Sequence, residues 1–221
     1  MTDHELNPPE IIVDEPGALV RAPEQPPTVL PAVILEDVVP FPGPLAPVLV
    51  EDERRRDAIL HAKSNAGFVL LVNRQPPLPG ALPKPTMGED DGAPSTRGPL
   101  VQTLGELVPV GVVGRVIKVF RMPDDRSAAL VQLVRRATPI ELLKREPFPV
   151  VRCLFPAEVS SKRADSEAVL RQLKTNLAAF FDEHEQAPTE LKMAAAALDE
   201  PSVLADFVGQ HLARDVREMT D

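Results

Sequence analysis

The hydrophobic pattern is densest over residues 30–50, which read LPAVILEDVVPFPGPLAPVLV. Four prolines between residues 40 and 47 exclude a helix here, because each lacks an amide hydrogen and fixes its own φ angle. The pattern predicts a buried strand, a rigid corner that carries Phe41, and an apolar return over residues 45–50 that re-enters the core. We expect the rest of the chain to be organised around this segment.

The next apolar segments predict one short helix and several further strands. Residues 51–66 have helical character, and the inward face of this helix carries Ala58, Ile59 and Ala62. The pattern then predicts strands over residues 68–72, 108–120, 127–134 and 150–155, the second and third of which form a hairpin.

The strand over residues 108–120 carries two glycines, Gly111 and Gly114, which we expect at bends or bulges. After Gly114 the side chains alternate, which places on one face Val116, Lys118 and Phe120, and on the other face Ile117 and Val119.

From residue 157 the apolar spacing changes to the period of an α-helix, and three helices are predicted. The first begins near Asp165 or Ser166, and its apolar stripe comprises Val169, Leu170, Leu173, Leu177, Phe180 and Phe181. The second begins at Pro188 and buries Leu191, Ala194, Ala195 and Leu198. The third has Asp199 as its N-cap and Pro201 in its first turn, and its stripe comprises Leu204, Phe207, Val208 and Leu212.

Two segments lack such a pattern. Residues 1–27 are acidic and rich in proline, and we expect a disordered arm because they bury too little apolar surface to offset their ordering entropy. Within this arm the triplet over residues 11–13 is either a docking motif or an incidental apolar spot. Residues 75–100 are rich in proline and glycine and predict a long mobile loop.

The predicted fold class is therefore α+β, with three parts along the chain. An acidic arm over residues 1–27 precedes a small β-barrel domain with one short helix over residues 28–156, which contains the mobile loop. An all-α helical subdomain follows over residues 157–221.

Composition narrows the possible partners and location. The net charge of −9 and the absence of Tyr and Trp disfavour binding to nucleic acid, which needs cations and aromatic stacking. Cys153 stands alone, which excludes an internal disulfide and fits a reducing compartment. No secretory leader and no apolar run of membrane-spanning length occurs, so we expect a cytoplasmic protein without a membrane partner.

The sequence contains no recognisable catalytic, cofactor or metal site. No two of the four histidines have the spacing of a metal pair, and we expect His184 and His211 on exposed helix faces. Cys153 lies within a strand pattern and is expected to be a structural thiol. No phosphate-binding glycine loop or serine nucleophile elbow is present. The arginines at residues 54–56 could suggest anion binding, but we expect solvated helix charges paired with the preceding acidic residues. Because no catalytic motif is found, the chain itself is predicted not to be an enzyme.

Several short motifs occur in an order that resembles the N-terminal domain of the Lon family of ATP-dependent proteases. EDVVPFPG over residues 36–43 and PVLV over residues 47–50 resemble the family's opening "LPvLPLrdvVvFPG…lPLfv". Further similar stretches are VGVVGRV (110–116), FRMPDD (120–125), RRATPI (135–140) and residues 201–212. The resemblance implies a six-stranded, PUA-like β-barrel followed by a helical subdomain. It also implies a module that binds unfolded or damaged proteins, assists assembly and passes substrates to separate ATPase and peptidase modules.

Exposed apolar side chains and unpaired backbone are what an unfolded protein offers, so its binding site should be an apolar surface near a free strand edge. Phe41, Pro42 and Leu45 on the rigid corner are our candidate binding residues, with the alternative that Phe41 only fills the barrel. Two other functions remain open at this stage: a stand-alone PUA-like adaptor or oligomerisation module, and an RNA-binding module.

Overall fold

The computed structural model describes residues 25–36, 38–43, 45–75, 100–121, 127–157, 163–183 and 188–212. Residues 1–24 of the predicted arm and 76–99 of the predicted loop lie outside the described residues, as does His184. The chain divides into two compact units, one through Pro156 and one from Ala157. None of the described helices is long and apolar enough to cross a membrane.

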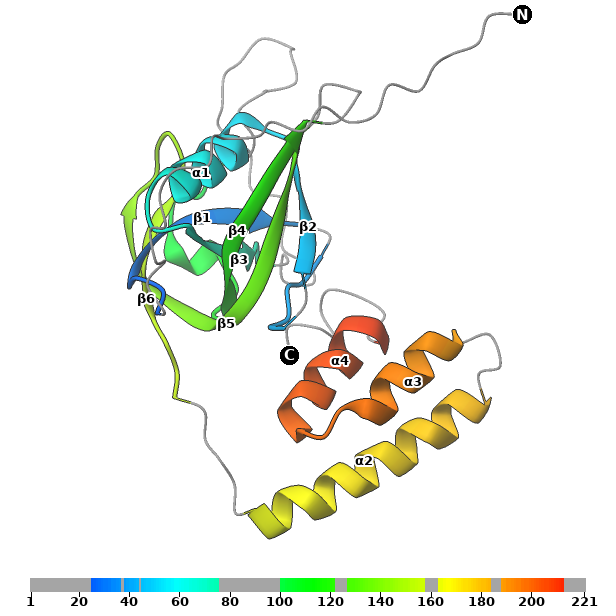
Figure 1. Ribbon diagram of the computed structural model, residues 1–221. Helices are drawn as coiled ribbons and strands as arrows, with labels where there is room; N and C mark the ends of the chain where they lie inside the picture. The colour runs from blue at the N-terminus through cyan, green and yellow to red at the C-terminus, as the bar shows by residue number, and fades with distance from the viewer. Residues whose placement is uncertain are drawn as a thin grey trace, which may run out of the picture. The chain divides into compact units, whose positions relative to one another are not determined.

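The first unit is a mixed sheet with one α-helix (Figure 1). Its elements are β1 (Val29–Leu35), β2 (Leu45–Val50), α1 (Glu53–Ser64), β3 (Phe68–Asn73), the short 3₁₀ helix η1 (Leu104–Glu106), β4 (Gly111–Arg121), β5 (Ser127–Lys144) and β6 (Val150–Leu154). The order of the predicted strands and helix is confirmed. The predicted inward residues of α1, which are Ala58, Ile59 and Ala62, are all buried.

The strands lie in the order β2-β5-β4-β3-β1-β6, and β5 also pairs with β6. The pairings therefore run in a closed circuit from β5 through β4, β3, β1 and β6 back to β5, and β2 is attached to β5 outside this circuit. β1 and β3 pair in parallel, while the other strand pairs are antiparallel.

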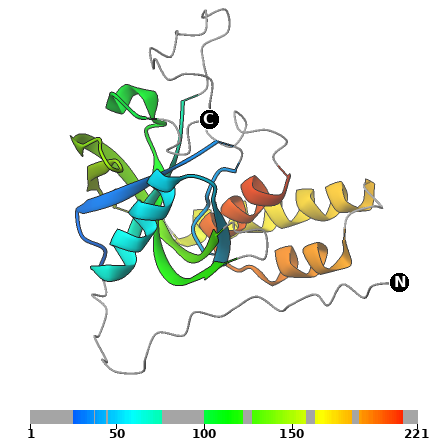
Figure 2. The same ribbon diagram turned by 90° about the horizontal axis from the view of Figure 1, so that it is seen from above.

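The core of this unit has two parts, one on each side of β1 and β3. Val33 and Leu71 belong to a cluster that includes the inward face of α1, which lies against β1 (Figure 2). Leu30 and Leu70 belong to a second cluster with Cys153. Because both faces of these two strands are buried, their sequences are almost continuously apolar rather than alternating.

The predicted end of β5 at residue 134 is wrong, because the strand continues to Lys144. Its first part pairs with β4 and its second part, from Thr138, pairs with β6. The adjacent charges of Arg135 and Arg136 obscured this continuation in the sequence. The Arg135 guanidinium lies 5.0 Å from the centre of the Phe155 ring, so a charged side chain is accommodated on the outside of a continuous strand.

The predicted alternation along β4 is interrupted. The register with β5 shifts between Val116 and Lys118, so that Ile117 is an extra residue at a bulge. Val116 and Val119 consequently pack against the same core cluster, although an uninterrupted strand would place them on opposite faces. A second register shift, between Val113 and Gly114, confirms the irregularity predicted at the second glycine.

The second unit contains α2 (Arg163–Glu183), α3 (Thr189–Ala197) and α4 (Pro201–Leu212). α3 and α4 both pack against α2. Their shared core is formed by the buried side chains of Leu177, Phe181, Ala195 and Leu204 and by partly buried Leu170, Leu173, Phe180, Leu191, Leu198, Phe207 and Val208. His211 is exposed, as predicted.

Three details of the helix prediction are wrong. Val169 and Ala194 are exposed rather than inward, because each lies beside the buried stripe of its helix and not within it. α2 begins at Arg163, before the predicted start. α4 begins at Pro201, as predicted, but Asp199 is not its N-cap. The first helical hydrogen bond runs from the Leu204 amide to the carbonyl oxygen of Glu200 at 3.0 Å, whereas the Asp199 carboxylate accepts from Lys174 Nζ at 3.1 Å.

Cys153 is 1% exposed and has the expected structural character. Burial raises the pKa of its thiol from its ordinary value of 9.0 to about 11. Because the raised pKa favours the neutral thiol in the folded state, its contribution to stability is complete below pH 9 and is lost as the pH rises towards 11.

The same burial predicts a slow thiol. At pH 8 the native protein is expected to react with a thiol reagent at least about 100-fold more slowly than the protein in denaturant, since the thiolate fraction falls about tenfold for each unit by which the pKa rises. Stopped-flow labelling with and without denaturant measures this ratio. Equal rates in the two conditions would contradict a buried thiol.

Candidate functional site

The segment between β1 and β2, residues 38–43, is called the corner here, and hydrogen bonds hold it at both ends. Asn73 Nδ2 donates to the carbonyl oxygen of Val38 at 3.1 Å and to that of Leu35 at 3.4 Å. At the other end the Gly43 amide donates to the carbonyl oxygen of Leu133 at 2.9 Å. Gly43 has a φ angle of +113°, which an L-residue rarely adopts. The corner is therefore fixed to β3 and β5.

The structure places the three predicted binding residues together at this corner. Phe41 and Pro42 are half-buried, and Leu45, the first residue of β2, is 56% exposed. Phe41 belongs to neither of the two core clusters of the first unit. In the same corner Val38 is 66% exposed, so this segment offers several apolar side chains to solvent.

The prediction that residues 45–50 return into the core is only half correct. Val48 and Val50 are buried, but Leu45, Pro47 and Leu49 face solvent. β2 is an edge strand with one face on the core, so alternate residues must point away from it. The sequence concealed this arrangement because both faces of β2 carry apolar residues.

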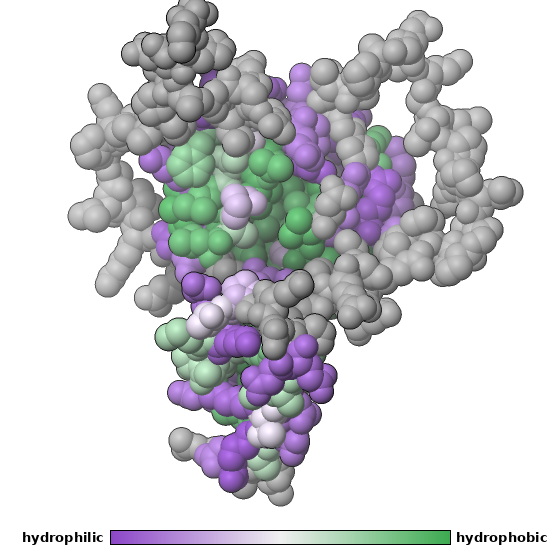
Figure 3. All heavy atoms as spheres, turned by 90° about the vertical axis from the view of Figure 1, so that its right-hand side faces the viewer, coloured by the Kyte–Doolittle hydropathy of each residue, from purple (hydrophilic) through white to green (hydrophobic). Residues whose placement is uncertain are grey.

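The exposed side of β2 continues across β5 onto β4. Strand register places side chains in three rows on one face, which are Leu45–Gln132–Arg115, Pro47–Leu130–Lys118 and Leu49–Ala128–Phe120. We call these nine residues the outer face. Leu49 is 44% exposed, and Ile117 at the adjacent bulge is 47% exposed. Figure 3, which views the side of the molecule where β2 lies, shows a broad hydrophobic area.

The outer face ends at an edge of the sheet. Among the described strands, β2 pairs only with β5, so its other side presents backbone groups without a strand partner. Pro47 lies in this strand, and a proline is tolerated in an edge strand because it has no amide hydrogen to contribute to a ladder. An apolar surface and a free strand edge thus lie side by side.

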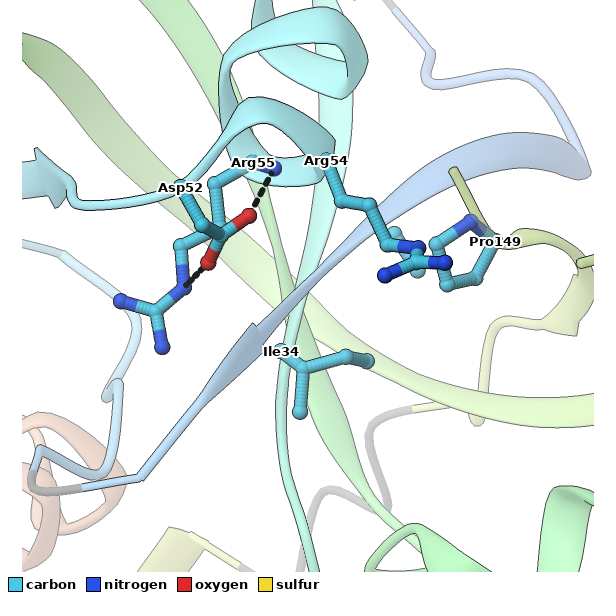
Figure 4. Close-up of a pocket in the computed structure, with 6 residues that line it drawn as sticks. Ile34, Asp52, Arg54, Arg55 and Pro149 are labelled. Carbon is cyan, nitrogen blue, oxygen red and sulfur yellow. Dashed lines mark hydrogen bonds and ion pairs between the residues drawn. The ribbon is translucent and has the colours of Figure 1, made fainter. Parts of the chain in front are cut away.

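A second cluster of functional groups lies at the start of α1, and it is structural. Asp52 accepts a hydrogen bond from the Arg55 amide at 2.8 Å and pairs with Arg55 Nε at 3.2 Å (Figure 4). Arg55 also pairs with Glu51. Arg54 extends toward Pro149 on the other side of Ile34, and its guanidinium lies 3.4 Å from a Glu146 oxygen (Figure 4).

These contacts correct the prediction of solvated arginines for Arg54 and Arg55 but not for Arg56, which is 52% exposed. The predicted pairing with the preceding acidic residues is confirmed for Arg55. The side chains of Arg54 and Arg55 are only 14% and 11% exposed, because they cover the end of the core beside Ile34. The hollow between them has a volume of about 10 Å³, which is space for no more than a water molecule. A neighbouring groove is lined by Glu53, Asp57 and Glu146, whose carboxylates do not suit an apolar ligand.

No group of three or more potential metal ligands occurs among the residues that the structure describes. Burial raises the pKa of the Cys153 thiol and so keeps it protonated, which does not suit a nucleophile. The outer face and the corner, which expose apolar side chains beside the free edge of β2, are the candidate functional site.

Sequence reasoning missed most of the outer face and the residue that supports the corner. Asn73 is 1% exposed and was not identified, although a single polar residue at the end of the apolar stretch over residues 68–72 was an available signal. The rows across β5 and β4 could not be identified, since they depend on strand order and on the bulge at Ile117.

A family model described as the substrate-binding domain of ATP-dependent protease La (LON) matches residues 29–220. A Lon protease of Trichlorobacter lovleyi is 24% identical over 217 residues, which make up 98% of this chain and 23% of that protein. Lon protease 1 of Myxococcus xanthus is 27% identical over 188 residues, or 83% of this chain and 21% of that protein. The chain thus spans less than a quarter of the length of these relatives.

The fold is shared with a solved structure, the N-terminal domain of a Lon protease from the Mycobacterium avium complex. The two align with a TM-score of 0.62 over 86% of this chain and 87% of that chain, at 21% sequence identity. The α+β fold class is confirmed by this match. The family model that matches this chain describes a substrate-binding domain and not a catalytic one, which confirms the prediction that this chain is not itself an enzyme. The chain belongs to the family of substrate-binding domains of the ATP-dependent protease Lon.

Proposed function

We propose that this chain recognises unfolded or damaged polypeptides for a Lon-type ATP-dependent protease. The observation that carries the proposal is the apolar outer face beside the free edge of β2. A folded protein hides its apolar side chains and pairs its backbone, whereas an unfolded chain offers both. A surface with exposed leucines and unpaired backbone therefore distinguishes the unfolded form from the folded form.

Phe41, Pro42 and Leu45 form the start of this binding surface in our proposal, and Leu49 and Leu130 extend it. Leu45 and Leu49 are 56% and 44% exposed, so each retains apolar area that a ligand can cover. The hydrogen bonds of Asn73 and Gly43 fix the corner before a ligand arrives, which reduces the entropy lost on binding.

The remaining parts of the proposal concern architecture and setting. The closed circuit of strand pairings supports a small PUA-like β-barrel over residues 28–156, followed by a helical subdomain over residues 157–221. We infer that this module associates with further copies or with the ATPase and peptidase modules of a protease, in the cytoplasm. Nucleic acid is a poor partner for a chain of net charge −9 without Tyr or Trp.

The absence of tryptophan from the sequence allows a direct binding test. A permanently unfolded, Trp-containing polypeptide is titrated with the full chain, and its fluorescence and anisotropy are followed, with the native form of the same polypeptide as control. Binding to the unfolded form alone is expected. Equal binding to both forms, or to neither, would contradict the proposal.

A pair of substitutions then locates the site. Leu45→Ser is expected to weaken binding about fivefold, since roughly 1 kcal/mol of apolar contact is lost. Leu154→Ser on β6 is the matched control, because Leu154 is 57% exposed but lies outside the outer face. Phe41→Ala is expected to weaken binding as well. Equal effects of the two serine substitutions would exclude the outer face as the site.

A further inference from the structure

The outer face has a charged border on its β4 side. Arg115 is exposed and Lys118 is half-buried, with its ammonium group 5.4 Å from the centre of the Phe120 ring. Neither side chain forms an ion pair within the part of the chain that the structure describes. This is unexpected in a chain with 33 acidic and 24 basic residues.

The surrounding strands are also basic. The described charged residues of β4 and β5 are Arg115, Lys118, Arg121, Arg135, Arg136 and Lys144, with Glu141 as the one carboxylate among them. On the outer face itself the two charged side chains, Arg115 and Lys118, are both basic, although the whole chain is negative.

Strand spacing relates the charged border to the apolar part. Neighbouring strands lie about 4.8 Å apart, so β2 and β4 are separated by about 10 Å across β5. An extended chain advances about 3.3 Å per residue, so about three residues cover this distance. A polypeptide that crosses the outer face with an apolar side chain on Leu45 or Pro47 brings a residue about three positions away to Arg115 or Lys118, respectively.

We propose that the outer face selects extended segments in which an aspartate or glutamate lies two to four positions from a group of apolar residues. The apolar group covers Leu45, Leu49 and Leu130, and the carboxylate pairs with Arg115 or Lys118. This inference rests on the proposed function and specifies the class of polypeptide that the surface prefers.

Three Trp-containing peptides with one apolar core test this preference. The peptides differ at a single residue, three positions from the apolar core, which is Glu, Gln or Lys. With the full chain at low ionic strength, the Glu peptide is expected to bind about fivefold more tightly than the Gln peptide, and the Lys peptide more weakly than both. The differences are expected to shrink in about 0.5 M salt, because exposed charges are then screened.

Two double variants with the same change in net charge test the location. Arg115→Gln with Lys118→Gln is expected to make the Glu and Gln peptides bind equally. The control combines Arg56→Gln on α1 with Lys144→Gln on β5. Arg56 is 52% exposed. The Lys144 ammonium lies 5.9 Å from the centre of the Phe148 ring, which matches the contact between Lys118 and the Phe120 ring. The control is expected to keep the preference for Glu.

All titrations are repeated on a full chain carrying Ile11→Ser and Ile12→Ser. The triplet over residues 11–13 lies between Glu10 and Asp14 and has the chemistry of the proposed ligand, so this background serves as the control for competition from within the chain. The preference for Glu must be present on this background.

The outcomes separate this inference from the proposed function. Equal affinity for the Glu and Gln peptides would overturn the charge preference and leave recognition of unfolded chains intact. Loss of the preference in the control variant instead would assign it to another surface. Failure of all three peptides and of the unfolded polypeptide would overturn both proposals. Dimerisation that Leu45→Ser abolishes would assign the outer face to a second copy and would also overturn the inference.

Discussion

Gly114→Ala is expected to destabilise the first unit by about 2–3 kcal/mol, although it adds only one methyl group. A Cβ atom at this position would overlap Cγ1 of Val131, a fully buried, β-branched residue of the neighbouring strand. Val131 lies in the core that also contains Val116 and Leu133, so it has little room to move. Urea unfolding followed by circular dichroism measures the change.

A second substitution tests this explanation. Val131→Ala alone is expected to cost about 2 kcal/mol through the cavity that it creates. In the double variant the new methyl group occupies part of that space, so the combined loss is expected to be smaller than the sum of the two single losses. Gly105→Ala is the matched control with no expected loss, because a Cβ atom there has nothing within 4 Å. Additive losses at Gly114 and Val131 would contradict the proposed overlap.

Asn73→Ala is the second substitution with a large expected effect, a loss of about 2–3 kcal/mol in the free energy of unfolding. It removes the donor that the carbonyl oxygens of Leu35 and Val38 share, and it does so at a side chain only 1% exposed to water. Because these bonds hold one end of the corner, binding of the unfolded polypeptide is also expected to weaken. Urea unfolding and the fluorescence titration measure the two effects.

Asn65→Ala provides the comparison. Asn65 Nδ2 donates to the carbonyl oxygen of His61 at 2.7 Å, but at an exposed helix end where water replaces the lost donor. Its expected cost is below about 1 kcal/mol, without an effect on polypeptide binding. If Asn65→Ala and Asn73→Ala had similar costs, the corner would not depend on a buried hydrogen bond.

Short stretches of sequence determine the helices and strands of this fold, whereas the pairing of strands that are distant in the sequence assembles the candidate functional site. The apolar stretch over residues 68–72 and the capped helix with Ala58, Ile59 and Ala62 inward could be predicted because their burial is set within a few residues. The length of β5 could not be predicted, because two adjacent arginines, Arg135 and Arg136, are typical of the end of a strand. Only the folded structure shows that β5 continues, with Arg135 against the Phe155 ring and the second part of β5 paired with β6.

The candidate functional site could likewise be predicted from the sequence only in part. The corner at Phe41 was predictable from its prolines, and an apolar surface near a strand edge was predicted from what an unfolded protein exposes. The solvent-facing side of β2 could not be predicted, because an edge strand that exposes Leu45 and Leu49 to solvent has the same apolar composition as a buried strand. Arg115 and Lys118 joined this surface only through the register of β4 with β5.

Amide hydrogen exchange of the full chain, with and without the unfolded polypeptide, reveals whether the outer face and the edge of β2 bind the polypeptide. The free edge of β2 has no strand partner among the described residues, so bound polypeptide is expected to slow exchange over residues 45–50 and in the adjacent corner. α2, α3 and α4 are expected to be unaffected. Slowed exchange confined to these helices, with β2 unchanged, would exclude the edge of β2 as the site where polypeptide binds.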